Sequence, residues 1–370
     1  MSSDGASALA WLTRAEAVAA ELTEQWGVPL DAATAVTGRA ALLGLRPRGR
    51  ISAGGATRLM PTRDGWWALT LARPDDVAAV PALIEADTEP EDPWAAVAHW
   101  ATQRDGDEAV ERAGLLDLPA ARLGETTATP PRVTQSGNRG TPRPAAGLLV
   151  ADLSSMWAGP QCGQVLAAAG ATVVKVESLS RPDGTRAGDQ RFYDWMNHGK
   201  LSYALDFDRD HDRLQALLMA SDIVIEGSRP GALMRRGLSP EALPGRDGRV
   251  WLRISGHGPD SQRVAFGDDA AVAGGLVDAG PVFCGDAIAD PLTGLESALA
   301  VAHSLQRGGG ETIEVAMAGV AAAYAAFSAG QPVSPISPPQ APTSFPPAAA
   351  LGADIAAVES IVAQRNSVSC

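Results

Sequence analysis

Cysteine, tyrosine and phenylalanine are scarce in this sequence, which narrows the classes of protein it can represent. The 370 residues include three Cys, three Tyr and six Phe. Cys162, Cys284 and Cys370 are widely scattered, so they provide neither a disulfide framework nor the ligand spacing of a zinc site. No uninterrupted run of about 18 apolar residues is present, so no membrane-spanning helix is expected. The first residues lack the pattern of a signal peptide, and we therefore expect a cytoplasmic protein that does not bind membranes.

Positive charge is also in deficit. Lys and Arg total 30 against 43 Asp and Glu, which gives a formal net charge of −13. A strongly acidic protein repels phosphate backbones, so nucleic acid is not an expected partner. Any anionic ligand must be held by local cations. With 45% hydrophobic residues the chain can bury a sizeable core, and its length predicts two domains.

Several familiar motifs of catalysis and binding are missing. The sequence has no GxxxxGKS/T phosphate loop, no GxGxxG after a predicted strand and no GxSxG elbow. Its five His are dispersed, so no metal site is expected. What the sequence does contain is a series of Gly-rich turns between predicted strands and helices, some of which carry carboxylates.

Residues 1–125 are predicted to form a small α+β domain. The apolar spacing of 7–25 indicates a helix. In the stretch 57–71, the pair Asp64-Gly65 separates two apolar runs, which is a strong signal for a β-hairpin. Further helices are expected after Pro74, after Pro93 and over 107–114.

After residue 125 the composition changes twice. Residues 126–146 have the Pro, Gly, Thr and Ser content of a linker. Over 147–330, apolar runs alternate with helical stretches, which predicts a mostly parallel sheet that binds ligands beyond the carboxyl ends of its strands. The apolar runs are 148–152, 172–176, 202–205, 223–225, 250–254 and 312–315. Residues 331–370 are predicted to form a proline-rich strap and a C-terminal helix.

Motifs of the second half follow one another in a specific order. They span 150–177, 195–200, 202–206, 222–226, 229–233, 254–258, 289–294 and 307–317. Each is weak alone, but the ordered set resembles the family III CoA-transferases, the CaiB/BaiF group that includes formyl-CoA and carnitine CoA-transferases. The resemblance implies a Rossmann-like, mostly parallel α/β domain that binds CoA, with the smaller α+β domain placed N-terminally. In the family the small domain normally follows the first part of the CoA domain, so this chain looks circularly permuted.

The resemblance also implies an activity. Family members move CoA between an acyl-CoA and a carboxylic acid through an aspartyl anhydride and an aspartyl-CoA thioester, and they form homodimers. CoA and acyl-CoA would be substrates, with no tightly bound cofactor. The resemblance puts the catalytic aspartate at Asp290. Residue types alone favour another role, since Asp290-Pro291 before an apolar helical run is typical of a helix N-cap.

CoA contacts are assigned by the same resemblance. They are Trp157, Ala158, Asn197, Lys200, Gly227, Ser228 and Arg235. Lys200 and Arg235 would meet the phosphates of CoA, although each could equally be a solvated surface charge. Trp157 would border the pantetheine channel or the adenine, and its alternative role is core packing.

Four further features affect the choice of function. Gly54-Gly55 could form a glycine loop over the thioester or a merely flexible loop, and His257 could enter the active site or sit in a turn. Asp268 stands where related α-methylacyl-CoA racemases have a His, which disfavours racemisation. Ser178 replaces a basic residue common in the family. The alternatives to a CoA-transferase are therefore an acyl-CoA racemase or epimerase of the same fold, or a degenerate paralogue that binds CoA without catalysis.

Overall fold

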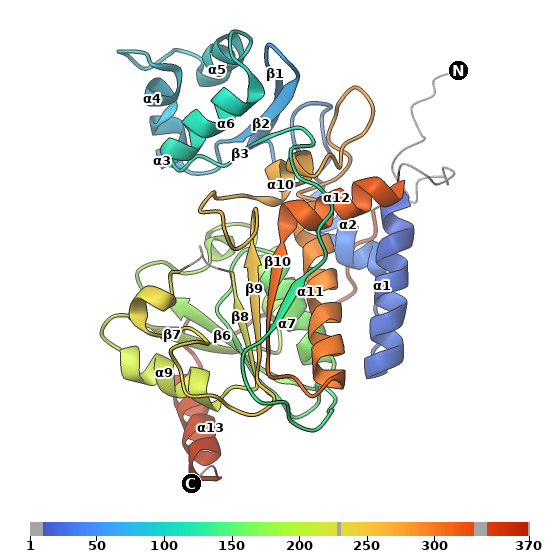
Figure 1. The fold of residues 1–370 in the computed structure, drawn as a ribbon, viewed down its shortest axis with the longest axis vertical. Helices are drawn as coiled ribbons and strands as arrows, with labels where there is room; N and C mark the ends of the chain where they lie inside the picture. Colours follow the sequence, from blue (N-terminus) through green and yellow to red (C-terminus); the bar gives the residue numbers. More distant parts are fainter. Residues whose placement is uncertain (1–9, 228–230, 329–338, 369–370) are drawn as a thin grey trace.

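The computed structural model describes residues 10–227, 231–328 and 339–368 (Figure 1). It contains a large unit built around one sheet and a small unit that lies at one end of it. Within the described ranges, none of the helices combines the length and hydropathy needed to cross a lipid bilayer.

The seven-stranded sheet of the large unit has the order β4-β10-β9-β8-β5-β6-β7. Its strands are β4 (Arg132–Gln135), β5 (Leu149–Asp152), β6 (Thr172–Ser178), β7 (Leu201–Leu205), β8 (Ile223–Glu226), β9 (Val250–Ser255) and β10 (Glu311–Ala316). All neighbours pair in parallel except β4, which is antiparallel to β10. Every residue of β5 and β8 is buried, as expected for central parallel strands covered on both faces. The predicted mostly parallel α/β sheet is confirmed.

Helices cover both faces of this sheet. One face packs against a single apolar core shared by α1 (Ala10–Trp26), α2 (Ala32–Leu43), α7 (Ala158–Ala168), α11 (Ala289–Gln306) and α12 (Met317–Ser328). The other face packs against α9 (His211–Ala220) and α13 (Ile355–Val368). Four shorter elements border the carboxyl ends of the strands, namely α8 (Gln190–Asn197), α10 (Gly267–Ala273) and the 3-10 helices η1 (Gly184–Ala187) and η2 (Met234–Arg236).

The small unit is an antiparallel sheet with short helices. Its strands β1 (Thr57–Pro61), β2 (Trp66–Thr70) and β3 (Ala120–Arg122) lie in that order. The hairpin predicted at Asp64-Gly65 is confirmed by the pairing of β1 with β2. Its helices are α3 (Pro74–Ala78), α4 (Val80–Ile84), α5 (Pro93–Ala101) and α6 (Gly106–Leu115). Its core holds Trp67, Leu83 and Trp100, and β1 and β2 also pack on α10 through Leu59, Ala68 and Val272.

The first two helices do not pack with the small unit. Trp11, Leu22 and Val36 are buried in the same core as Ile223 and Leu295 of the large unit. The sequence predicted a small domain over all of 1–125, whereas α1 and α2 lie in the core of the large unit. Periodicity shows that a helix buries one face, but it does not show which partner covers that face. We propose a small domain limited to about β1 through β3.

The segments expected to be a linker and a proline-rich strap differ in how far the structure describes them. Residues 132–135, inside the predicted linker 126–146, form β4, because β-branched Val133 and Thr134 pair with the open edge of β10 and Arg132 forms a 2.6 Å ion pair with Glu314. The proline-rich strap expected over 331–347 lies partly outside the described residues, and 339–347 contain neither helix nor strand.

Candidate active site

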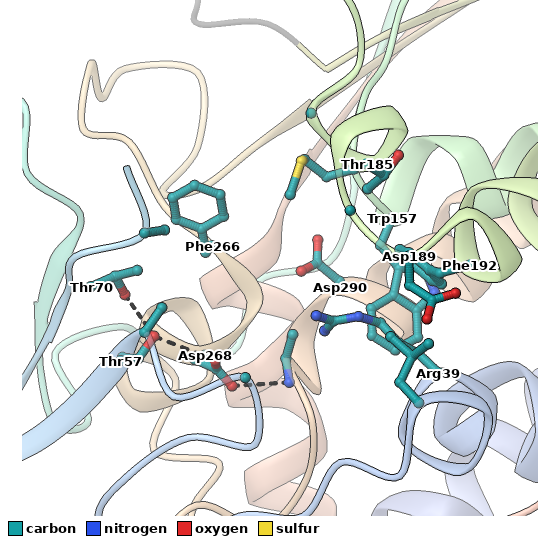
Figure 2. Close-up of a pocket in the computed structure, with 18 residues that line it drawn as sticks. Arg39, Thr57, Thr70, Trp157, Thr185, Asp189, Phe192, Phe266, Asp268 and Asp290 are labelled. Atoms are coloured by element: carbon teal, nitrogen blue, oxygen red, sulfur yellow. Dashed lines mark hydrogen bonds between the residues drawn. The ribbon is translucent and has the colours of Figure 1, made fainter. Parts of the chain in front are cut away.

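A cavity of about 270 Å³, here called cavity A, separates α2 and the β1–β2 hairpin from the start of α11 (Figure 2). Its lining consists of Arg39, Leu43, Gly54, Ala56, Thr57, Thr70, Ala72, Met156, Trp157, Gly184, Thr185, Gly188, Asp189, Phe192, Phe266, Asp268, Ala287 and Asp290. The cavity is thus built from segments that lie far apart in the sequence.

A second cavity of about 190 Å³, cavity B, lies at the carboxyl ends of β5, β8 and β9. It is lined by Ser154, Ser155, Met156, Ala158, Gly159, Gly227, Ile254, Ser255, Gly256, Arg263, Val264, Ala265, Phe266, Asp290 and Met317. This is the edge where parallel sheets bind their ligands. Asp290 lines both cavities, together with Met156 and Phe266.

Asp290 lies in the first turn of α11, which begins at Ala289 with Ile288 as its N-cap. The N-cap role that residue types favoured for Asp290 is therefore wrong. Its carboxyl group interacts instead with the backbone N–H groups of Ala158 and Gly267, the first residues of α7 and α10. The side chain therefore lies between the two cavities and does not cap its own helix.

Burial raises the pKa of Asp290 to about 7. The charge of Asp268 adds to this rise, whereas Arg39 and the two backbone N–H groups oppose it. A carboxyl group with a pKa near neutrality ionises at physiological pH while remaining poorly solvated. Such a group is a suitable nucleophile toward an activated carbonyl.

Arg39, on α2, is a cation of cavity A that the sequence did not reveal. Its Nη1 donates a hydrogen bond of 2.9 Å to the buried Asp286. The guanidinium carbon lies 5.5 Å from the ring centroid of Trp157 and 5.2 Å from that of Phe192. Two aromatic faces and a carboxylate therefore hold the cation in place, and Figure 2 shows it pointing toward Asp290. No motif marks Arg39, so only the tertiary structure reveals it.

Two buried aspartates at the start of α10 connect the units. Asp268 accepts hydrogen bonds from the backbone N–H of Ala287 at 2.9 Å and the hydroxyl of Thr57 at 3.4 Å. Asp269 accepts one from the Thr70 hydroxyl at 2.9 Å, and the two threonine hydroxyls lie 2.9 Å apart. Burial, reinforced by Asp286, raises the pKa of Asp268 to about 6, and burial raises the pKa of Asp269 to about 7.

Several residues assigned from the resemblance meet around Asp290. Trp157 is buried, lines cavity A and makes an edge-on contact with Phe192 at 5.3 Å between ring centroids. Ala158 and Gly227 line cavity B. A Cβ atom on Gly227 would lie 3.0 Å from Cβ of Ser154, so the close approach of the two strand ends suits glycine.

Lys200 and Asn197 are positioned differently from the expectation. The Lys200 ammonium is buried, and it donates to Asp152 at 2.9 Å, to the Pro160 carbonyl at 2.8 Å and to Asn197 Oδ1 at 3.2 Å. The Asn197 amide donates to the backbone carbonyl of Tyr193. This geometry contradicts a direct contact between Lys200 and a phosphate, since all three ammonium protons already have protein acceptors beneath α7.

The remaining predicted residues are spread out. Gly54 lines cavity A, and Gly55 beside it has φ +81°, a left-handed conformation that favours glycine. Arg235 is exposed in η2, and Ser228 lies outside the described residues. Nδ1 of His257 is 3.9 Å from Glu125, and burial lowers the pKa of His257 to about 4. As far as the described residues go, neither cavity lining includes His257 or Arg235, so the structure does not support His257 as an active-site residue.

Arg263 is a second residue that the sequence did not single out. It lines cavity B, and its Nη2 donates to the Ala120 carbonyl and to Glu125, both at 2.7 Å. It therefore links the wall of cavity B to β3 of the small unit. Its position after β9 was the signal, because loops after parallel strands converge on the ligand edge of the sheet.

Comparison with known proteins gives a consistent assignment. The sequence profile of CoA-transferase family III matches residues 146–354. Succinate–glutarate CoA-transferase from Agrobacterium fabrum is 31% identical over 209 residues, which cover 49% of this chain and 52% of that protein. Formyl-CoA:oxalate CoA-transferase from Afipia carboxidovorans is 30% identical over 194 residues, which cover 46% of each chain. The chain thus spans about half the length of the curated relatives it matches.

Among solved structures, a crystal structure of a CaiB/BaiF family protein from Brucella suis aligns with a TM-score of 0.44 and 27% identity, over 50% of this chain and 55% of that one. The assignment itself rests on the family profile, which covers more than half of the 370 residues. The chain belongs to CoA-transferase family III.

Proposed function

We propose that this chain transfers CoA from an acyl-CoA to a carboxylic acid, with Asp290 as the nucleophile. The observation that carries the proposal is the position of Asp290 at the junction of cavities A and B, with a pKa raised to about 7. The pantetheine end of CoA would enter cavity B, at the ligand edge of the sheet, and the acyl group would occupy cavity A. The thioester carbonyl would then lie beside Asp290.

The chemistry balances with this one carboxylate. A carboxylate oxygen of Asp290 attacks the thioester carbonyl, the C–S bond breaks, and an aspartyl anhydride and CoA thiolate result. The thiolate attacks the aspartyl carbonyl, which releases the donor acid and leaves an aspartyl-CoA thioester. The acceptor carboxylate attacks this thioester to form a second anhydride and again frees the thiolate. The thiolate then attacks the acceptor's carbonyl, so that new acyl-CoA forms and the Asp290 carboxylate is restored.

Fixed donors near Asp290 support these steps. The backbone N–H groups of Ala158 and Gly267 and the guanidinium of Arg39 act on its carboxyl group and favour negative charge there. Each tetrahedral intermediate carries an oxyanion, and preorganised donors in a poorly solvated site stabilise such charge strongly. With Lys200 in the interior, Arg263 in cavity B is the better-placed cation for the CoA moiety.

Mass spectrometry tests the proposal directly. The protein is incubated with a panel of acyl-CoAs and digested, and the peptide containing Asp290 is examined for a CoA adduct that hydroxylamine removes. Asp290→Asn should lose both the adduct and transfer. Asp212→Asn is a matched control, since Asp212 is an exposed first-turn aspartate of α9. Transfer at the wild-type rate by Asp290→Asn, or absence of acyl-CoA binding, would contradict the proposal.

The quaternary structure is also a proposal. We propose a homodimer, because the family resemblance implies one, and analytical ultracentrifugation should then give twice the chain mass of 38.1 kDa. A sedimenting species of the single chain mass would refute it. The cytoplasmic location stays a prediction from the sequence.

A further inference from the structure

The charges that line cavity A are strongly unequal. Among its described lining residues, Arg39 is the single Arg, Lys or His, whereas Asp189, Asp268 and Asp290 are acidic. Asp189 is paired with Arg191, whose Nη2 lies 2.7 Å from its carboxylate. An anion bound in cavity A would therefore meet a single cationic side chain among the described lining residues, that of Arg39.

The cation is held so that part of it remains directed into the cavity. Nη1 of Arg39 is engaged by Asp286, and the guanidinium plane lies against Trp157 and Phe192. Nη2 lies 3.9 Å from the position that a Cβ on Gly54 would take, on the cavity wall. A guanidinium carries five N–H donors in a planar fork that matches a carboxylate, so one can bind Asp286 and a second anion at once.

The rest of the wall is mostly apolar. Leu43, Met156, Trp157, Phe192 and Phe266 supply its large side chains, with three alanines among the small ones. A volume of about 270 Å³ has room for a chain of several carbon atoms beside the carboxyl group. Apolar walls favour an apolar tail, because burying it removes its surface from water.

From these observations we infer, on the basis of the function proposed above, that cavity A accepts a monocarboxylic acid with an apolar tail. Arg39 binds the carboxylate of this acid beside Asp290 and is the specificity-determining residue. A dicarboxylic acid is disfavoured, because its second carboxylate would be buried against an apolar wall or face Asp268. The charge balance favours binding of the acceptor at the thioester stage. When Asp290 is held as its CoA thioester, it has lost its negative charge, and the acceptor carboxylate replaces that charge.

Acids matched in length test the selectivity. Butyrate is compared with succinate and pentanoate with glutarate as acceptors, with butyryl-CoA and succinyl-CoA as donors. Each acceptor carries an isotopic label, so that exchange with its own CoA ester is visible, and kcat/KM is measured for each acceptor. We expect at least a tenfold preference for the monocarboxylic member of both pairs. Equal or better transfer to succinate and glutarate overturns the inference and leaves the proposed function intact. If neither donor produces a CoA adduct on Asp290 and none is transferred, the proposed function fails, and the inference fails with it.

Substitutions at Arg39 test the role of the guanidinium. Arg39→Gln should raise KM for butyrate at least tenfold. The kcat for transfer of CoA from the aspartyl thioester to butyrate should change by a smaller factor. The KM of Arg39→Lys should lie between those of the wild type and Arg39→Gln. Because Arg39→Gln leaves Asp286 without its partner, the double variant Arg39→Gln/Asp286→Asn removes both charges together and should show the same KM defect in a folded protein. A wild-type KM in the double variant overturns the assignment of Arg39.

The chain offers a matched control for these variants. Arg14 pairs with Glu296 at 2.9 Å and lies over the ring of Tyr324 at 4.8 Å, so it combines an ion pair with an aromatic contact, as Arg39 does with two rings. Arg14 is not among the described lining residues of either cavity. Arg14→Gln should therefore keep the wild-type KM for butyrate. A KM defect equal to that of Arg39→Gln would show that loss of any such arginine is sufficient, and would overturn the inference.

Discussion

Asp268 accepts a hydrogen bond of 2.9 Å from the backbone N–H of Ala287, a residue held at φ +43° two positions before the helix that carries Asp290. A second aspartate forms an equivalent hydrogen bond before α7. Asp183 accepts from the backbone N–H of Met156, which has φ +73° and precedes that helix. Left-handed conformations are unfavourable for residues with a Cβ, so each needs surrounding contacts to persist. Two buried carboxylates thus shape the turns that aim α7 and α11 at the site.

Asp268→Asn separates the charge of this residue from its hydrogen bond. The amide oxygen can still accept from Ala287, so the turn should persist, but the neighbouring negative charge that helps to raise the pKa of Asp290 is lost. In the wild type, kcat/KM for acyl-CoA should rise with pH through about 7 as Asp290 ionises. In the variant this rise should move to lower pH. An unchanged profile measured from pH 5 to 8 would argue against electrostatic coupling of the two residues.

Asp269 should make the protein less stable as pH rises. Its pKa is raised to about 7 in the folded state from 3.8, so between these values the folded state binds more protons than the unfolded state. Stability contributed by the proton is present below about 4 and is lost as pH increases toward 7. Relative to Asp269→Asn, the wild type should therefore lose up to ~1.4 kcal/mol of unfolding free energy per pH unit in this window. Urea denaturation at pH 5 and 7.5 measures the difference, and a gap independent of pH would contradict it.

Gly267→Ala should damage the site. A Cβ at this position would lie 2.3 Å from the Ala287 carbonyl oxygen and 2.4 Å from Oδ2 of Asp290, so both the Ala287 backbone and the carboxyl group of Asp290 must move. We expect at least a tenfold loss of CoA adduct formation on Asp290, since such displacements disturb near-attack geometry. Gly114→Ala is the matched control, because Gly114 is also helical and a Cβ there meets nothing within 4 Å. Equal adduct yields from the two variants would refute the steric argument.

Lys200→Met should act on stability rather than on affinity for CoA. The substitution leaves the buried Asp152 without its ion-pair partner, which typically costs ~3–5 kcal/mol. Chemical denaturation should show this loss. Calorimetric titration with CoA, under conditions where the variant is folded, should give the wild-type salt dependence. A weaker salt dependence would instead restore the phosphate contact expected from the sequence.

The family resemblance, rather than any local pattern, supplied Trp157, Ala158 and Gly227 as candidate CoA contacts. Each follows a predicted strand, and the carboxyl ends of parallel strands share one edge of the sheet, which explains why these three residues lie close together. The failure at Lys200 has a different origin. A lysine is expected in solvent unless a buried partner is known, and the pairing with Asp152 spans 48 positions that no local pattern connects.

Arg39 was out of reach for a related reason. Its helix shows only that one face is buried, and its approach to Asp290 depends on how α2 packs against the large unit. Hydrophobic periodicity carries no information about such a partner. A charged side chain can therefore reach a site from a helix that carries no recognisable motif. Such a residue is identified only from the three-dimensional structure.

The packing of α1 and α2 changes how the small unit is connected. Since α2 precedes β1 and lies in the core of the large unit, and β4 follows β3 and pairs with β10, both ends of the small unit are fastened to the same body. The unit is thus an insertion rather than an appendage at one end. A rigid swing of the small unit away from the sheet would have to bend two connections at once.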